Sequence, residues 1–321
     1  MQTRLTELLG IEHPVMLAGM GGVSYHRLAA AVSEAGGIGT LGAATMSDEV
    51  LGAEMAALAG ATDKPWGVDL LTAMPGDMTA QVQRIVDAGA RIFVGALGVP
   101  REVITLCHDA GVLVVNMCGR VHHAVLAAEA GCDLVVAQGT EAGGHTGRVA
   151  TLPLVPQIVD AVGDRVPVVA AGGIVDGRGM AAALALGADG VWLGTRFIAT
   201  PEARVSLGYH DALLRADESQ TTVSRAYSGK PMRVVANSYT EYFDHHPEEL
   251  SPFPEQMLHS ITGGVLHLPT GPDDPNVDPT RECYPSGQGV GAIDTLVPAG
   301  DLVRQLVAEA EQALQRVDRL R

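Results

Sequence analysis

The sequence is poor in aromatic residues and in positive charge. Aromatic residues make up 4% of the 321 residues, and 21 Lys and Arg stand against 37 Asp and Glu, which gives a formal net charge of −16. This charge argues against a nucleic-acid partner and against a polybasic membrane contact, because both need clustered cations. We expect an acidic surface that keeps the protein soluble.

Cysteines and long apolar runs are also scarce. The four cysteines, Cys107, Cys118, Cys132 and Cys283, form no C-x-x-C pair, and we predict buried free thiols in a reducing compartment. No apolar stretch approaches the roughly 20 residues of a membrane span, and the first residues lack the apolar core of a signal peptide. A cytoplasmic protein, with a homodimer as the commonest assembly, is the expectation.

Motifs of several enzyme classes are missing. The sequence has no G-x-S-x-G elbow and no Walker lysine, and Gly19–Gly22 lacks the spacing of a dinucleotide-binding turn. His122–His123 and His245–His246 are adjacent pairs. Neighbouring side chains on a helix or strand point in different directions, so we predict no metal site.

Short apolar runs alternate with Ala-rich amphipathic segments over about the first 200 residues. Eight runs are short, continuously apolar and rich in β-branched residues, as strands covered on both faces should be. They are Val15–Ala18, Ile38–Leu41, Trp66–Leu70, Ile92–Gly95, Leu113–Asn116, Leu134–Ala137, Val168–Ala171 and Gly190–Leu193. Helical spacing is found in Tyr25–Ala35, Asp48–Leu58, Met78–Ala88, Arg120–Ala130 and Gly177–Leu186.

A recurring sequence motif divides these segments into strand–helix units. Several predicted helices end on a glycine that precedes the next strand, as at Gly36, Gly89, Gly111, Gly131 and Gly187. Eight such strand–helix units predict an α/β protein with a closed (β/α)8 TIM barrel. An open doubly wound sheet is the alternative, and it would need the missing dinucleotide-binding turn.

Three regions are predicted along the chain. Residues 1–204 would form the barrel, and residues 205–284 would be a small inserted cap after strand eight. The cap contains helix-like pieces at Leu207–Asp217 and Glu255–Ser260 and Pro- and Asp-rich turns at 269–275. Residues 285–321 would return to the barrel and close it with a final helix.

Glycines follow the last two predicted barrel strands. Gly172 and Gly173 come after Ala171, and Gly194 and Thr195 come after strand eight. At these paired positions a barrel can hold a phosphate with backbone N–H groups and a short helix N-terminus. The alternative is that these glycines only make tight turns.

A histidine lies in a Gly-rich loop after the sixth strand. His145 follows Gln138, Gly143 and Gly144 at the expected barrel mouth. Histidine there suits proton transfer or hydrogen bonding to an anion, and the glycines let a flat ligand approach closely. The alternative is a capping or solvated residue.

Other strand ends carry small residues and one carboxylate. Ala18 and Gly19 leave room for a ring system, and Met20 could pack on its edge. Asp69 could accept a hydrogen bond from a ring N–H or a ribityl hydroxyl, unless it makes a buried ion pair or a helix cap. Far along the chain, Gln288 could reach the same mouth.

The order of these pieces resembles the nitronate monooxygenase family, which includes the FMN-dependent enoyl-acyl-carrier-protein reductases of bacteria. The matching pieces are residues 3–14, Ala35–Gly39, Lys64–Asp69, Glu141–His145, Ala170–Ile174 and Gly194–Phe197, with a weak match at 286–288. Three features depart from the family: Asp69 replaces a usual Asn, Met117 stands where some relatives have Lys, and region 205–284 differs.

The resemblance implies a barrel that holds non-covalent FMN. Gly172, Gly173, Gly194 and Thr195 would match the phosphate loops, and His145 would match the active-site histidine. The residues matching positions around the ring and the ribityl chain are Ala18, Gly19, Met20, Asp69, Gln138, Gly143, Gly144 and Gln288.

Three functions remain open at this point. The first is nitronate monooxygenase activity, the oxidative denitrification of alkyl nitronates with O2. The second is reduction of an enoyl thioester with NAD(P)H as co-substrate. The third is a non-enzymatic flavin-binding protein whose cap is an interaction module. The first two take a small-molecule nitronate or acyl thioester.

Overall fold

Eight parallel strands form the centre of the protein. The structure, a computed structural model, describes residues 1–72, 77–96, 98–267 and 277–320. Each barrel strand overlaps one of the eight predicted runs. The strands are β1 (Val15–Leu17), β2 (Gly39–Gly42), β3 (Trp66–Leu71), β4 (Ile92–Ala96), β5 (Leu113–Cys118), β6 (Leu134–Gln138), β8 (Val168–Ala171) and β9 (Gly190–Leu193).

The sheet closes on itself. Its strand order is β1-β9-β8-β6-β5-β4-β3-β2, and every neighbouring pair is parallel. A bridge between Met16 and Ile38 joins the first and last strands, where Leu17 N donates to Ile38 O at 2.9 Å. The predicted (β/α)8 barrel is confirmed, and the open sheet is excluded because an open sheet leaves two unpaired edges.

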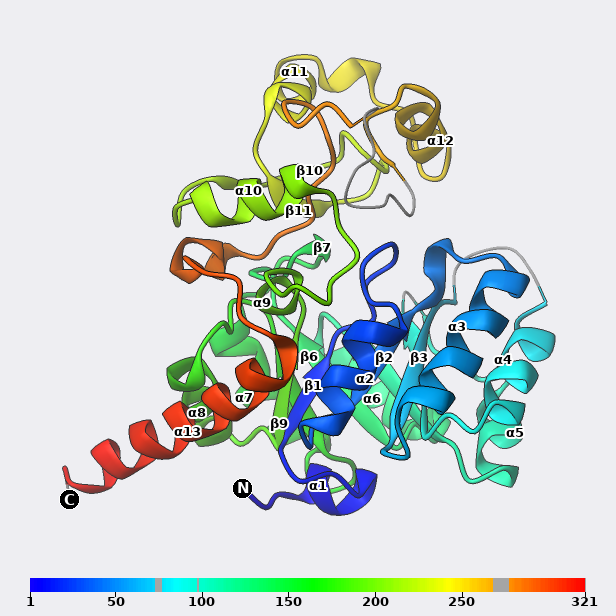
Figure 1. Cartoon of the computed structure of the whole chain (residues 1–321), viewed down its shortest axis with the longest axis vertical. Helices are drawn as coiled ribbons and strands as arrows, with labels where there is room; N and C mark the ends of the chain where they lie inside the picture. Colours follow the sequence, from blue (N-terminus) through cyan, green and yellow to red (C-terminus); the bar gives the residue numbers. More distant parts are fainter. Residues whose placement is uncertain (73–76, 97, 268–276, 321) are drawn as a thin grey trace.

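Apolar side chains fill the barrel from within. Met16, Val94 and Val136 belong to an inner cluster that is separate from the larger cluster beneath the outer helices. Helix α1 (Arg4–Leu9) adds Leu5 and Leu9 to this inner cluster. Figure 1 shows α1 below the barrel, so it plugs the end opposite the site.

Helices surround the barrel. They are α2 (His26–Glu34), α3 (Asp48–Ala61), α4 (Met78–Asp87), α5 (Ile104–Asp109), α6 (Val121–Ala130), α7 (Thr151–Val162), α8 (Gly177–Ala185) and α13 (Ala299–Asp318). Left-handed glycines end five of them as predicted, with φ between 72° and 101° at Gly36, Gly89, Gly111, Gly131 and Gly187. Short turns complete the barrel at η1 (Ala43–Thr45), α9 (Thr195–Ile198) and η3 (Gln288–Ala292).

The last helix packs between the first and last outer helices. Helix α13 contacts both α8 and α2. Glu309 Oε2 accepts from Gly177 N at 2.9 Å, and a Cβ atom on Gly177 would lie 2.3 Å from Ala310 N. Glycine at this position therefore lets the two helices approach closely.

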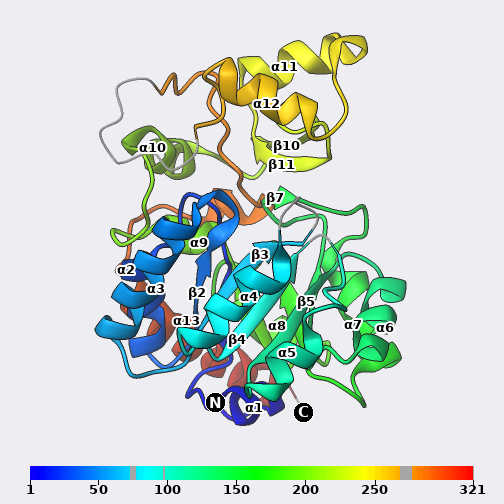
Figure 2. The ribbon, with the colours of Figure 1, turned by 90° about the vertical axis from the view of Figure 1, so that its right-hand side faces the viewer.

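Residues 205–267 and 277–284, which we call the cap, lie over the carboxyl ends of the barrel strands, and the N-terminus and the end of helix α13 lie toward the other end (Figures 1 and 2). The cap elements are α10 (Leu207–Arg215), β10 (Thr221–Ser224), β11 (Met232–Val235), α11 (Ser238–His245), η2 (Pro247–Glu249) and α12 (Glu255–Thr262). A small core around Tyr227, Val234 and Val265 holds them together. The predicted turns at 269–275 fall outside the described residues, and the boundaries of the three regions stay a prediction.

A small antiparallel sheet ties the cap to the barrel. Strand β7 (Gly144–His145) pairs with β11, with His145 opposite Met232. The two-residue strand β7 was not predicted, because it exists only through this distant partner.

The cysteines and the helix lengths bear on the remaining expectations. All four cysteines are buried and free, as predicted. Among the described residues, no helix combines the length and hydrophobicity that a membrane crossing needs. The cytoplasmic location and the homodimer stay predictions.

Candidate active site

A large cavity opens between the barrel and the cap. Its volume is about 970 Å³, at the upper end of the range for ligand pockets. It lies where barrel enzymes place their chemistry, at the carboxyl ends of the strands. The predicted site residues that line it are Ala18, Gly19, Met20, Asp69, Gln138, Gly143, Gly144, His145, Ala171, Gly172, Gly173, Gly194 and Thr195.

Gln288 does not fit its predicted place. Its side chain is exposed and does not line the cavity, whereas the neighbouring Gly287 and Gly289 do. Gln288 N donates to Glu141 O at 2.9 Å, and Gly287 N donates to Thr195 Oγ1 at 2.8 Å. The segment therefore crosses the mouth with its backbone toward the barrel, which turns the Gln288 side chain to solvent.

The loops after β8 and β9 are shaped by glycine. Gly172 and Gly173 have φ of 107° and 72°, a left-handed backbone that other residues rarely adopt. Thr195 begins the four-residue helix α9. Phe197 N and Ile198 N donate to Gly194 O, which leaves the N–H groups of Thr195 and Arg196 without a helical partner. Backbone donors at this rim can therefore hold an anion.

A carboxylate braces the loop that carries the histidine. Glu141 Oε2 accepts from Thr151 N at 2.7 Å and from Thr151 Oγ1 at 2.6 Å, and so caps helix α7. A Cβ atom on Gly143 would lie 2.9 Å from Gly287 N. The loop is thus pinned on one side by α7 and on the other by the returning chain.

The cavity floor contains a buried carboxyl without a partner. Asp69 is 8% exposed and lines the cavity, and it makes no hydrogen bond or ion pair with any described residue. Burial raises its pKa well above the ordinary value. A Cβ atom on Gly19 would lie 2.2 Å from Asp69 Cβ, so only glycine fits there. Among the described residues, the Asp69 side chain makes neither an ion pair nor a helix cap.

His145 is held between the barrel and the cap. Its carbonyl accepts from Gln138 Nε2 at 2.8 Å, and its Nε2 lies 2.9 Å from Ser228 Oγ of the cap. Burial, aided by the Lys230 ammonium, lowers the pKa of His145 to about 4. The imidazole is therefore neutral at physiological pH. Its Nδ1 has no hydrogen-bond partner among the described residues.

The cap contributes further lining residues that the sequence did not indicate. Ser228, Lys230, His267 and Glu282 all line the cavity. Glu282 is 5% exposed, and its Oε2 lies 2.6 Å from His267 Nδ1. No spacing pattern in the sequence marks these residues. They are far apart along the chain and come together only when the cap folds.

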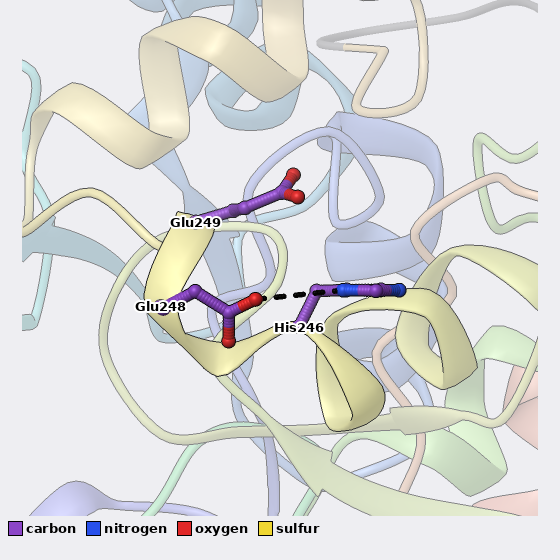
Figure 3. Close-up of side chains that lie close together, drawn as sticks. All are labelled: His246, Glu248 and Glu249. Atoms are coloured by element: carbon purple, nitrogen blue, oxygen red, sulfur yellow. Dashed lines mark ion pairs between the residues drawn. The ribbon is translucent and has the colours of Figure 1, made fainter.

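One other cluster carries metal-ligand side chains. Among the described residues, His246, Glu248 and Glu249 are the group whose ligand atoms lie within 4.8 Å of one another (Figure 3). His246 Nδ1 lies 3.5 Å from Glu248 Oε1, and Tyr242 Oη donates to Glu249 Oε2 at 2.8 Å. These contacts between exposed side chains explain why the three residues lie close together without a metal ion. The absence of a metal site stays a prediction.

A closed parallel barrel with one large cavity at its carboxyl end has the architecture of a barrel enzyme. The model of the nitronate monooxygenase family matches residues 2–80 and 71–309. The chain belongs to this family and is a flavin-type oxidoreductase. This assignment overturns the alternative of a non-enzymatic flavin-binding protein. Proteins of the family are generally FMN-dependent.

Three relatives show the range of the family. The (3aS,4S,5R,7aS)-5-hydroxy-7a-methyl-1-oxo-octahydro-1H-indene-4-carboxyl-CoA dehydrogenase of Mycobacterium tuberculosis is 42% identical over 242 residues, 75% of this chain and 68% of that protein. A probable nitronate monooxygenase of Staphylococcus saprophyticus is 32% identical over 304 residues, 80% of this chain and 84% of that protein. The structure of FabK from Thermotoga maritima is 33% identical with a TM-score of 0.90, and the match covers 100% of both chains.

Proposed function

We propose that this protein is an FMN-dependent nitronate monooxygenase. Three features support FMN as the cofactor: a cavity of about 970 Å³, glycine loops after β8 and β9, and the buried unpartnered carboxyl of Asp69. A ligand with a phosphate at one end and hydrogen-bonding ring atoms at the other would satisfy both ends of this cavity. Bound FMN would supply the electron-accepting chemistry.

The observation that carries the substrate proposal is the neutral His145. With a pKa of about 4, His145 is a poor base for a neutral nitroalkane at physiological pH. It suits a nitronate, which is already an anion. Ser228 Oγ lies 2.9 Å from His145 Nε2 and 3.3 Å from Lys230 O, so its single proton serves one of the two acceptors. When it donates to Nε2, the imidazole keeps its proton on Nδ1 and can donate to a nitronate oxygen.

The charge of the cavity supports an anionic substrate. Arg120, Arg148, Arg204 and Lys230 line it, although the whole chain carries a formal charge of −16. The acidic lining residues, Asp69 and Glu282, are both buried, and Glu282 pairs with His267. A locally cationic cavity in an acidic protein attracts anions.

The test compares an alkyl nitronate with its parent nitroalkane under air. We expect the purified protein to show a flavin spectrum and to release nitrite from propyl-2-nitronate, with much slower turnover of 2-nitropropane at pH 7. Flavin binding without nitrite release at any nitronate concentration would exclude this function.

The second candidate is NAD(P)H-dependent reduction of an acyl thioester, and the size of the cavity favours it. A small nitronate needs little of the space that remains beside a flavin, whereas a thioester with a phosphate-bearing arm could use both the space and the arginines. The 42% identical relative acts on a CoA compound by its name. Bleaching of the bound flavin by NADH or NADPH without oxygen would favour this candidate.

A further inference from the structure

Among the described residues, the Asp69 carboxyl has no charged neighbour. In the sheet it lies opposite Gly42 of β2 and Val94 of β4. The segment 18–22, strands β2 and β4 and the turn η1 surround its end of β3, and none of them contains a titratable residue. Burial is the sole cause of its raised pKa.

An ionised carboxylate at this position would be very costly. A buried charge needs a cation or several donors, and Asp69 has neither among the described residues. A neutral acid avoids that cost and carries an O–H that can donate a hydrogen bond. Asp69 would then donate this hydrogen bond, whereas the sequence led us to expect that it accepts one.

We propose that Asp69 is held as a neutral carboxylic acid that donates a hydrogen bond to an acceptor atom of the bound flavin. This inference rests on the proposed FMN site. A neutral carboxyl has one donor side and one acceptor side, so it can bind the flavin without placing a charge in the site.

The first test observes the proton directly. The infrared spectrum of the wild type minus that of Asp69→Asn, both at pH 7, should contain the C=O stretching band of a protonated carboxylic acid. Asp63→Asn is the matched control, because Asp63 is exposed and precedes the opposite end of β3. The same difference taken with Asp63→Asn should lack the band. Its absence from the Asp69→Asn difference would overturn the proposal.

The second test measures FMN dissociation constants across pH for the wild type and Asp69→Asn. Both variants share the ionisation of the FMN phosphate, so their ratio isolates Asp69. We expect similar affinities over the pH range in which the flavin-free protein shows the infrared band. Above the pH at which the band disappears from the flavin-free protein, the wild type should weaken relative to Asp69→Asn by up to about tenfold per pH unit. A ratio that changes without loss of the band would contradict the proposal.

Failure of the proposed function would look different. The infrared test also applies to the flavin-free protein, because the burial of Asp69 does not require a ligand. A chain that shows the acid band but binds no FMN at any pH would refute the FMN site and the hydrogen bond to flavin, but not the neutral acid. A chain that binds FMN but lacks the band would refute the neutral acid alone.

Discussion

The barrel and the cap contribute different halves of one site. The barrel supplies the glycine loops and Asp69 from strand ends that point to the same mouth. The cap supplies Ser228, which contacts the imidazole of His145, and Lys230, whose ammonium adds to the effect of burial in lowering the pKa of His145. Under the proposed function, the barrel side would hold the cofactor, whereas the cap side would adjust His145 toward the substrate.

Because the cap and the barrel contribute separate residues, the cap can vary while the barrel loops stay the same. Strand β7 is the physical link, because its pairing with β11 attaches the His145 loop to the cap. A change in the cap can therefore alter the chemistry of His145 without touching the cofactor loops. The proposals are best tested by breaking each half separately.

The largest effect is expected from Gly19→Ala on the barrel side. The new Cβ atom would lie 2.2 Å from Asp69 Cβ, so the carboxyl or the segment 18–22 must move. Overpacking of this kind costs about 1–3 kcal/mol, which corresponds to FMN binding weakened by about 5- to 150-fold. Isothermal titration with FMN measures this change. Gly52→Ala is the control, because a Cβ atom on this α3 residue meets nothing within 4 Å; unaltered FMN affinity in Gly19→Ala would refute the close approach.

The next effect is expected at the junction of the two halves. His145→Ala should lower kcat/KM for a nitronate by about 100-fold, the usual loss when one donor to a reacting anion is removed. FMN affinity should stay within about threefold of wild type, since the cofactor loops are untouched. Steady-state nitrite release and flavin titration provide the two measurements. Loss of flavin together with activity would place His145 in the cofactor site instead.

A smaller effect is expected from the cap alone. Ser228→Ala removes the partner of His145 Nε2, 2.9 Å away, but leaves the imidazole in place. We expect kcat/KM to fall by about tenfold, the equivalent of one hydrogen bond. The double variant with His145→Ala should be no worse than His145→Ala, because Ser228 acts through the histidine. Additive losses would show that Ser228 acts independently.

A separate effect is expected on stability at low pH. The pKa of His145 is lowered to about 4 in the folded protein from an ordinary value of 6.5. Between these values the unfolded chain binds the extra proton, so stability is fully present above about pH 6.5 and falls as the pH drops toward 4. His145→Gln should lose less stability over this window, by at most about 3 kcal/mol. Thermal unfolding midpoints at pH 7 and pH 5 provide the comparison, and equal shifts in both proteins would argue against a buried neutral His145.

Much of the barrel was readable from the sequence. Continuous apolar runs marked the eight strands, and Gly36, Gly89 and Gly131 marked helix ends because left-handed backbone favours glycine. The residues just after the predicted strands could then be expected to line the cavity, since all parallel strands of a barrel point to one mouth. Gln288 was the exception, because no strand direction fixes a side chain in a returning loop.

The sequence by itself determined the barrel, the family and the strand ends that line the cavity. These follow from local periodicity and from short motifs, which need no knowledge of distant contacts. Only the tertiary structure decided the neutrality of His145, the isolation of Asp69 and the partners Ser228, Lys230 and Glu282. Burial and charge at a point depend on every segment that packs around it, and those segments meet only in the folded chain.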